Sequence, residues 1–348
     1  MNTTQPKQLS DIPVSVLDLV PVLAGKTPAD SFRNSLDLAR QVEKLGYKRY
    51  WMAEHHNMVG IASSATSVLI GYIAGGTSII RVGSGGIMLP NHAPLVIAEQ
   101  FGTLASLYPN RIDLGLGRAP GSDQLTAMAL RRSLQGSVND FPENVEEIRT
   151  YFSSENATSP VRAIPGEGLD IPIWILGSST FGAQLAGILG LPYAFASHFA
   201  PTYLHAALQV YRESFRPSES LKEPYVMVAA NAIVADTENE AHRLATSLYA
   251  SFINVIRGKS QPLQPPVDNM NEFWNDSEEY SVRQMLRYSF IGNPEQVKEN
   301  LQAFVDSTQA DELIISSHIY DHAARVRSYQ LIAEMKQTQE TLKYQDAL

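Results

Sequence analysis

The stretch Ile79–Pro94, which reads IIRVGSGGIMLPNHAP, decides the fold and organises the rest of the chain. Its apolar residues predict one buried strand, and they are Ile79, Ile80, Val82 and Ile87. Three glycines interrupt this strand near its end: Gly83, Gly85 and Gly86. Strands normally avoid glycine, which has no side chain to pack and loses more backbone entropy than other residues. The glycines therefore indicate either a flat or bulky ligand against the backbone or a strand that passes beneath a helix in a tight core.

Strand-like and helix-like segments alternate about eight times along the 348 residues, without a composition break that would mark a linker. Besides the central stretch, the expected strands are Val14–Leu19, Tyr47–Ala53, Arg111–Gly117, Ile171–Leu176, Pro192–Ala196, Pro224–Ala235 and Leu313–Ser316. Alternating units of this kind imply a parallel sheet. We therefore expect an α/β fold, a (β/α)₈ TIM barrel with insertions, formed by one domain over residues 1–348. A doubly wound sheet is the alternative.

The composition fits a well-buried globular enzyme, with 44% hydrophobic and 18% charged residues. A formal net charge of −9 and the lack of a dense Lys/Arg cluster argue against a nucleic-acid or anionic-membrane surface. The chain contains no cysteine, which excludes disulfides, thiolate metal sites and cysteine nucleophiles. No apolar run approaches the length of a membrane span, and the polar start lacks the apolar core of a signal peptide. These features predict a soluble, cytoplasmic protein.

Polar and glycine-rich positions follow most of the expected strands. In a (β/α)₈ barrel the active site lies at the carboxyl ends of the strands, so these positions are its candidate residues. They are Asp18, His55, His56, Gly85, Gly86, Arg118, Ser178, Ser179, His198, His318 and Tyr320.

Two of these strand ends suit a phosphate group. Arg118 offers a permanently charged fork of donors in a loop of glycine, alanine and proline. Ser178 and Ser179 begin a helix, so free backbone amides and hydroxyls gather there. A surface arginine and ordinary helix capping are the simpler explanations. Because both loops follow neighbouring strands beside the glycine-rich strand end, the pattern favours a phosphorylated planar cofactor.

The sequence Glu54-His55-His56 could supply general acid–base groups or metal ligands. Adjacent residues at a strand end point in different directions, so both histidines are not expected to bind one metal ion. No third ligand stands at a useful spacing, and we expect no metal site. Each histidine, taken alone, fits a structural hydrogen bond as well as a catalytic role.

Four motifs, in order, resemble the bacterial luciferase-like family of flavin-dependent monooxygenases: WMAEHHN (51–57), RVGSGGIMLPNHAP (81–94), RIDLGLGRAPGSD (111–123) and ILGSSTFGAQLAGILGLPYAFASHF (175–199). The resemblance implies a barrel that uses FMN, reduced by a separate flavin reductase. It also implies that a flavin C4a-hydroperoxide, formed with O2, oxygenates a small substrate of the aldehyde or ketone type. A homodimer is expected on the same basis.

The resemblance also assigns roles to single residues. Gly85 and Gly86 fall where the family has a non-proline cis peptide behind the flavin ring, and Arg118 falls on the arginine that binds the flavin phosphate. Ser179, with Ser178 beside it, falls on the phosphate-binding serine. The catalytic positions are His55 and its neighbour His56.

Two departures concern the light-emitting members of the family. Gly117 stands where luciferase has a reactive cysteine, and Ser178 stands where it has an acidic residue. Light emission and a long-chain aldehyde substrate are therefore not expected. An F420-dependent hydride-transfer enzyme and a non-catalytic flavin-binding protein are the alternative functions. Residues 257–280 coincide with a variable loop of the family, and we expect them to form a mobile lid.

Overall fold

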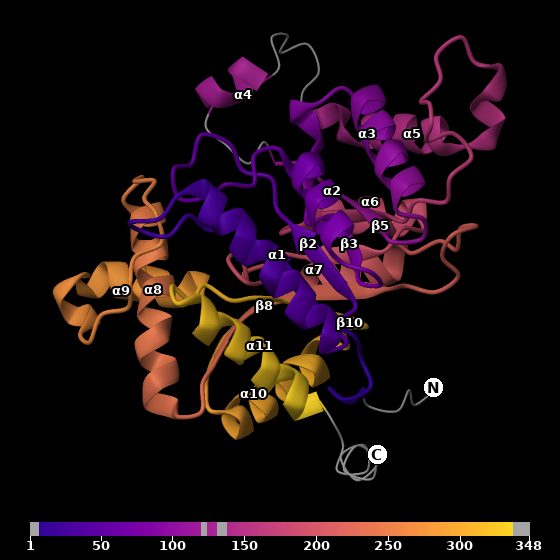
Figure 1. Cartoon of the computed structure of the whole chain (residues 1–348). Coiled ribbons are helices and arrows are strands. Elements are labelled where there is room, and N and C mark those ends of the chain that lie inside the picture. The colour runs from indigo at the N-terminus through magenta and orange to yellow at the C-terminus, as the bar shows by residue number, and fades with distance from the viewer. Residues whose placement is uncertain (1–6, 120–123, 131–137, 337–348) are drawn as a thin grey trace, which may run out of the picture.

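The computed structural model describes residues 7–119, 124–130 and 138–336 (Figure 1). Eight parallel strands close into a barrel, because the last strand pairs with both the first and the seventh. In chain order the eight are β1 Val14–Asp18, β2 Arg49–Met52, β3 Arg81–Ser84, β5 Ile112–Gly117, β6 Ile173–Gly177, β7 Tyr193–Phe195, β8 Val226–Val234 and β10 Glu312–Ser316. The predicted (β/α)₈ barrel is thus confirmed, and the doubly wound sheet is excluded.

Helices surround the strands, and Figure 1 shows α8 and α9 projecting to one side of the barrel. The longer helices are α1 Pro28–Lys44, α2 Thr66–Gly76, α3 Pro94–Leu107, α5 Phe141–Phe152, α6 Thr180–Leu189, α7 Leu204–Ser214, α8 Glu238–Ile256, α9 Asp276–Met285, α10 Pro294–Thr308 and α11 His322–Lys336. A shorter helix, α4 Gln124–Leu130, lies between β5 and α5 in the chain. Within the described ranges, no helix is both long and apolar enough to cross a membrane.

Local sequence signals fix where several helices begin. Thr27 caps α1 in a reciprocal capping box with Asp30, and Pro28 occupies the first turn. Asn293 caps α10 in the same way, with Gln296 as its partner. Both helices therefore begin at residues whose side chains suit a helix start.

The barrel interior has a charged layer below an apolar one. Near the amino ends of the strands, Arg49 forms ion pairs with Asp113 at 2.6 Å and with Glu312 at 3.0 Å. Above this layer, apolar side chains including those of Trp51 and Trp174 pack together, with their rings 5.1 Å apart. Side chains therefore fill the interior of the barrel. A ligand can bind only at the loops that follow the carboxyl ends of the strands.

The central stretch differs from its prediction in two respects. Ile79 is 76% exposed and precedes the strand, and the strand itself is divided into β3 and the short β4 Ile87–Met88. The glycines also have a reason in the packing of the protein itself. A side chain on Gly83 would come within 3 Å of Asp113 and Trp51, and one on Gly85 would lie 2.8 Å from Leu17. The packing of the protein therefore accounts for these glycines by itself, and a ligand against Gly85 and Gly86 stays a prediction.

One strand was not predicted. β9 Ser289–Gly292 pairs with the far half of the long strand β8, outside the eight strands of the barrel. It is short and only partly buried, so it lacks the apolar run by which the other strands were predicted.

The segment 257–280 lies against loops at the carboxyl end of the barrel. Leu263 is buried and bridges Leu23, in the loop that follows β1. The Val59 amide, in the loop after β2, donates a hydrogen bond to Ser260 Oγ at 3.0 Å. The helix α9 begins inside the predicted loop, at Asp276. Two anchors thus hold this segment beside the loops of the first two strands.

Candidate active site

The carboxyl ends of the barrel strands bring most of the predicted residues to one face. His55 and His56 follow β2, and Gly85 and Gly86 connect β3 to β4. The remaining members follow four other strands: Arg118, Ser178, Ser179, His198 and His318. Since the strands are parallel and form one barrel, these positions share one end of it. Pro120–Asp123, the end of one quoted motif, lie outside the described residues.

The Gly85–Gly86 peptide bond is cis, as the family resemblance predicts. Two backbone hydrogen bonds join it to the end of β2: the Gly85 amide donates to Met52 at 2.8 Å, and the Glu54 amide donates to Gly86 at 3.3 Å. A side chain on Gly86 would lie 2.8 Å from the Gly115 carbonyl oxygen. The segment therefore lies tightly between β2 and β5.

Arg118 and the start of α6 form a place suited to a phosphate. The Arg118 guanidinium lies over the ring of Phe181, 4.1 Å from its centre, so it is held beside the first turn of α6. Ser179 is the N-cap residue of this helix, yet its side chain makes no capping hydrogen bond. The first backbone amides, two serine hydroxyls and a cation are thus available together. This donor set fits the phosphate of a flavin mononucleotide.

Glu54 holds two imidazole rings and a backbone amide. His56 Nε2 and His92 Nε2 lie 2.7 and 2.8 Å from Glu54 Oε1, and the Met88 amide donates to Oε2 at 3.0 Å. Burial acts to raise the pKa of Glu54, but the hydrogen bonds from His92, His56 and Met88 hold this pKa below its usual range. We call Glu54, His56 and His92 the Glu54 clamp. It fastens the end of β2 to the loop that follows the cis peptide.

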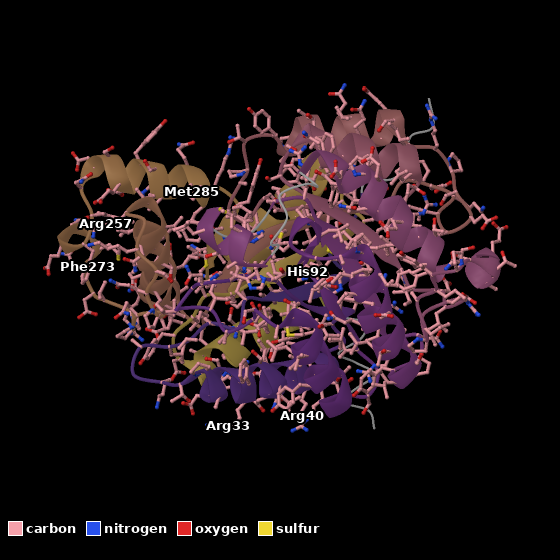
Figure 2. All side chains as sticks on the ribbon, turned by 90° about the horizontal axis from the view of Figure 1, so that it is seen from above. Arg33, Arg40, His92, Arg257, Phe273 and Met285 are labelled. Carbon is pink, nitrogen blue, oxygen red and sulfur yellow. The ribbon has the colours of Figure 1, made fainter. Side chains whose placement is uncertain are left out.

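His92 was missed by sequence reasoning, which found no third group near the histidine pair. It is the C-cap residue of the short 3-10 helix Leu89–Asn91, which lies beside the end of β2 only in the folded barrel. Figure 2 shows His92 toward the middle of the molecule, far from Arg33 and Arg40 on α1. One nitrogen or oxygen atom from each residue of the clamp lies within 4.8 Å of the others, a spacing that a metal ion could also use. In this structure both imidazoles are hydrogen-bonded to the Glu54 carboxylate, and these hydrogen bonds account for the geometry.

Three further histidines at the same end lack such partners. The Nδ1 atoms of His55, His198 and His318 are enclosed and have no hydrogen-bond partner. Burial is the main reason that the pKa of His198 falls to about 3 and that of His318 to about 4. Burial also lowers the pKa of His55. All three rings are therefore neutral at pH 7.

Two predicted candidates have structural roles instead. Asp18 accepts hydrogen bonds from the Val20 amide and Ser35, and pairs with Arg325 at 2.8 Å. It therefore faces the helices outside the barrel. The Tyr320 hydroxyl donates to the Ala24 carbonyl at 2.8 Å, which fastens one loop to another.

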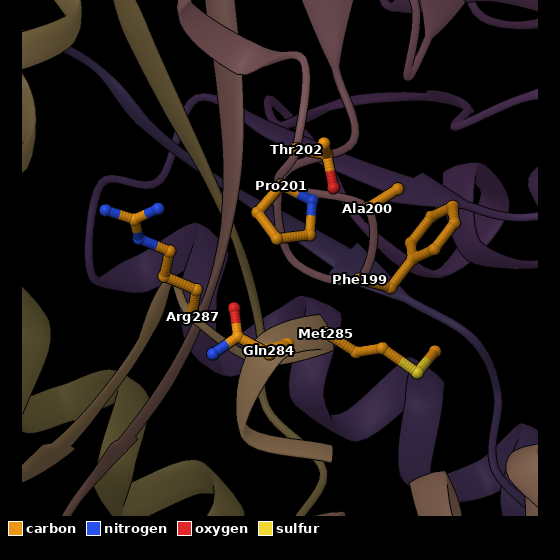
Figure 3. Close-up of a pocket in the computed structure, with 7 residues that line it drawn as sticks. All are labelled: Phe199, Ala200, Pro201, Thr202, Gln284, Met285 and Arg287. Carbon is orange, nitrogen blue, oxygen red and sulfur yellow. The ribbon is translucent and has the colours of Figure 1, made fainter. Parts of the chain in front are cut away.

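A pocket of about 290 Å³ lies next to the loop that follows His198 (Figure 3). It is lined by residues 199–202 and, at the end of α9 and just beyond it, by Gln284, Met285 and Arg287. Figure 3 shows the Met285 side chain extending below Phe199. The ring of Phe199 stands edge-on to that of His198, with 4.8 Å between centres, so the pocket adjoins the histidine group.

Comparison with known proteins places the chain in a family. The family described as luciferase-like monooxygenase matches residues 13–312. The chain belongs to the luciferase-like monooxygenase family. A luciferase-like monooxygenase of Escherichia coli (strain K12) is 53% identical over 326 residues, which cover 94% of this chain and 97% of the relative.

Two solved structures are similar to this luciferase-like protein. That of apo-MsnO8 has a TM-score of 0.83 and 35% identity, and covers 93% of this chain and 98% of the other. The oxygenating constituent of 3,6-diketocamphane monooxygenase from Pseudomonas putida, a type II Baeyer–Villiger monooxygenase in complex with FMN, has a TM-score of 0.69. Its identity is 18%, and the match covers 93% of this chain and 97% of the other. The latter likeness concerns the fold.

Proposed function

We propose that this luciferase-like protein is an FMN-dependent monooxygenase that oxygenates a small organic substrate of the aldehyde or ketone type. The proposal rests mainly on the candidate phosphate site. There the guanidinium of Arg118 stacks on Phe181 beside the first turn of α6, where the Ser179 side chain makes no capping hydrogen bond. The family and the FMN complex of a similarly folded enzyme support the same cofactor. Bound reduced FMN supplies the electrons with which one atom of O2 enters the substrate and the other leaves as water.

The protein contributes binding, orientation and a neutral acid. Arg118 and Ser179, with Ser178, bind the phosphate, which fixes the flavin relative to the cis peptide at Gly85 and Gly86. His55, neutral and buried at the end of β2, donates a proton from its accessible Nε2 to the reacting oxygen and then takes it back. Glu54 orients the ring of His56, because its carboxylate accepts a hydrogen bond from His56 Nε2.

The proposal includes partners outside this chain. A separate flavin reductase supplies reduced FMN, and two copies of the chain form a homodimer. Coelution with a reductase is not required, because reduced flavin can reach the site by diffusion. Sedimentation analysis of the purified protein measures the proposed dimer.

The function is tested by offering reduced FMN and reduced F420 under anaerobic conditions and then admitting ¹⁸O2 with a panel of aldehydes and ketones. We expect reduced FMN to bind more tightly than reduced F420 and ¹⁸O to appear in one organic product. Preference for F420 with hydride transfer and no ¹⁸O incorporation identifies the hydride-transfer alternative. Tight FMN binding without any product across the panel indicates a flavin-binding protein without catalysis.

A further inference from the structure

The histidines of this chain fall into two groups. Five of the eight have a polar partner: His56 and His92 with Glu54, His205 with Tyr288, His242 with Glu238 and His322 with Asp37. The other three, His55, His198 and His318, have an enclosed Nδ1 with no partner. Buried polar atoms normally have one, so an unpaired set at one end of a barrel needs an explanation.

These three rings gather from across the barrel mouth. They follow β2, β7 and β10, strands that are not adjacent in the barrel. Nearby His318 and His55 help to lower the pKa of His198, and nearby His55 helps to lower that of His318. Asn231 on β8 donates to the His198 carbonyl at 2.6 Å and so fixes that loop. The three rings therefore lie at the same end of the barrel, and we call them the mouth histidines.

Enclosure of Nδ1 decides which atom of each ring carries the proton. A neutral imidazole has one N–H donor and one bare nitrogen. A buried N–H without an acceptor is rarer in proteins than an under-used acceptor, so the proton belongs on Nε2. A ligand can reach these rings only by the Nε2 edge, because Nδ1 is enclosed. Each mouth histidine thus presents an N–H donor to the site.

The charges near the mouth histidines favour a neutral ligand over an anionic one. The mouth histidines are neutral at pH 7, and the buried guanidinium of Arg325 is already paired with Asp18 at 2.8 Å. Arg287 also lines the neighbouring pocket, but Figure 3 shows its guanidinium on the side away from Phe199, the residue next to His198. A carboxylate held at the mouth histidines would therefore lose its water without gaining that cation, and burying such a charge is costly. A neutral carbonyl oxygen accepts hydrogen bonds without that cost. The pocket of about 290 Å³ next to His198 leaves room for a small carbon skeleton.

We propose that His198 and His318, together with His55, bind the carbonyl oxygen of the substrate through their Nε2–H groups and thereby select carbonyl compounds. This inference rests on the proposed function, since it names the substrate contacts of that same site. His198 and His318 are specificity-determining residues in this account. Their rings contact the substrate oxygen, whereas the Glu54 clamp positions the loop after the cis peptide.

The first test reads the tautomers directly in protein labelled with ¹⁵N at histidine. Eight histidines give a spectrum in which single substitutions assign each ring. We expect Nε2–H tautomers for the three mouth histidines, and we expect 2-heptanone, benzaldehyde or ethyl acetate to shift their Nε2 resonances while heptane does not. Nδ1–H tautomers, or no shift with any of the three carbonyl probes, overturn the proposal.

The second test measures binding of whichever carbonyl probe shifts these resonances. Each of His198→Phe and His318→Phe should weaken binding about three- to tenfold, the value of one neutral hydrogen bond. His198→Gln and His318→Gln place an amide near the same point and should restore most of it. His242→Phe on the exposed face of α8 is the matched control and should change nothing. Unchanged affinity in both phenylalanine variants contradicts the proposal.

FMN affinity, measured on the same variants, separates this inference from the proposed function. We expect it to stay within twofold of wild type in His198→Phe and His318→Phe. Wild-type protein that binds the carbonyl probe but not FMN refutes the proposed function alone. Wild-type protein that binds FMN but shows no response of the mouth histidines refutes the inference alone.

Discussion

His55 is the residue whose substitution should reduce turnover most. Its ring is neutral at pH 7 and its Nδ1 is enclosed, so its Nε2 edge is the part available for proton transfer. His55→Ala should bind reduced FMN normally but lose about 10²–10⁴-fold in turnover, the usual contribution of a general acid–base group. Product formation from any carbonyl compound that wild type oxygenates measures this loss. Normal turnover by a stably folded His55→Ala ends the claim of catalysis.

A second prediction concerns the contribution of Glu54 to stability. Glu54→Gln removes the negative charge between two imidazoles and puts a neutral amide where a carboxylate accepted their hydrogen bonds. We expect unfolding free energy to fall by about 1–3 kcal/mol, as for a broken buried hydrogen bond to a charged group. Urea unfolding measures the loss. Glu238→Gln, whose carboxylate lies 3.8 Å from exposed His242, is the control, and an equal effect of the two substitutions contradicts the clamp.

Single residues also show where sequence reasoning stops. Arg118, Ser179 and His55 were found because each directly follows a predicted strand, and the barrel brings such positions to one end. Asp18 satisfies the same condition but faces outward, because strands buried on both faces carry no apolar alternation that marks the inner side. His92 lies in a loop 36 positions after His56 by sequence number, and only the fold brings both to Glu54.

A further prediction concerns the movement of the segment 257–280. Leu263 and Ser260 fasten its first part beside the loops after β1 and β2, so it borders the mouth. We propose that it closes over the mouth as a lid when flavin and substrate bind. Amide hydrogen exchange across 257–280 should then slow on addition of reduced FMN and substrate, while exchange in α5 stays constant. Unchanged exchange in the segment supports an ordinary surface connection.

Element boundaries were predictable where a capping signal coincides with a pattern, as at Thr27 and Asn293. They were not predictable where tertiary contacts decide. β3 and β4 were expected as one strand, because their apolar residues continue on either side of the glycines. The sequence leaves open whether the glycines make room for a ligand or for tight packing, and in the structure contacts with Leu17, Asp113 and Gly115 require them.

The whole molecule should lose stability in mild acid. The pKa values of His198 and His318, about 3 and about 4, lie below the value near 6.5 expected in the unfolded chain. Between pH 6.5 and 4 the unfolded chain therefore binds more protons, and the free energy of unfolding falls as pH falls. From pH 7 to pH 5 the loss is about 2 kcal/mol per histidine.

Urea unfolding at pH 7 and pH 5 measures this loss. The pKa of Asp18, which the Arg325 pair and hydrogen bonds lower against the effect of burial, keeps that carboxylate ionised throughout this window. The stability of His198→Phe should be less sensitive to pH than that of wild type, since one of the buried histidines that titrate on unfolding is gone. Identical pH dependence in both proteins is the result that contradicts the burial of His198.

The central claim is that the barrel mouth holds a flavin by its phosphate. It is tested most directly by comparing the affinities of FMN and riboflavin for wild type and Arg118→Ala, with Arg33→Ala on exposed α1 as control. The account predicts that Arg118→Ala weakens FMN binding by about 1.5–3 kcal/mol, the value of a charge-assisted contact, and leaves riboflavin binding nearly unchanged. Equal losses for FMN and riboflavin, or none for either, would contradict it.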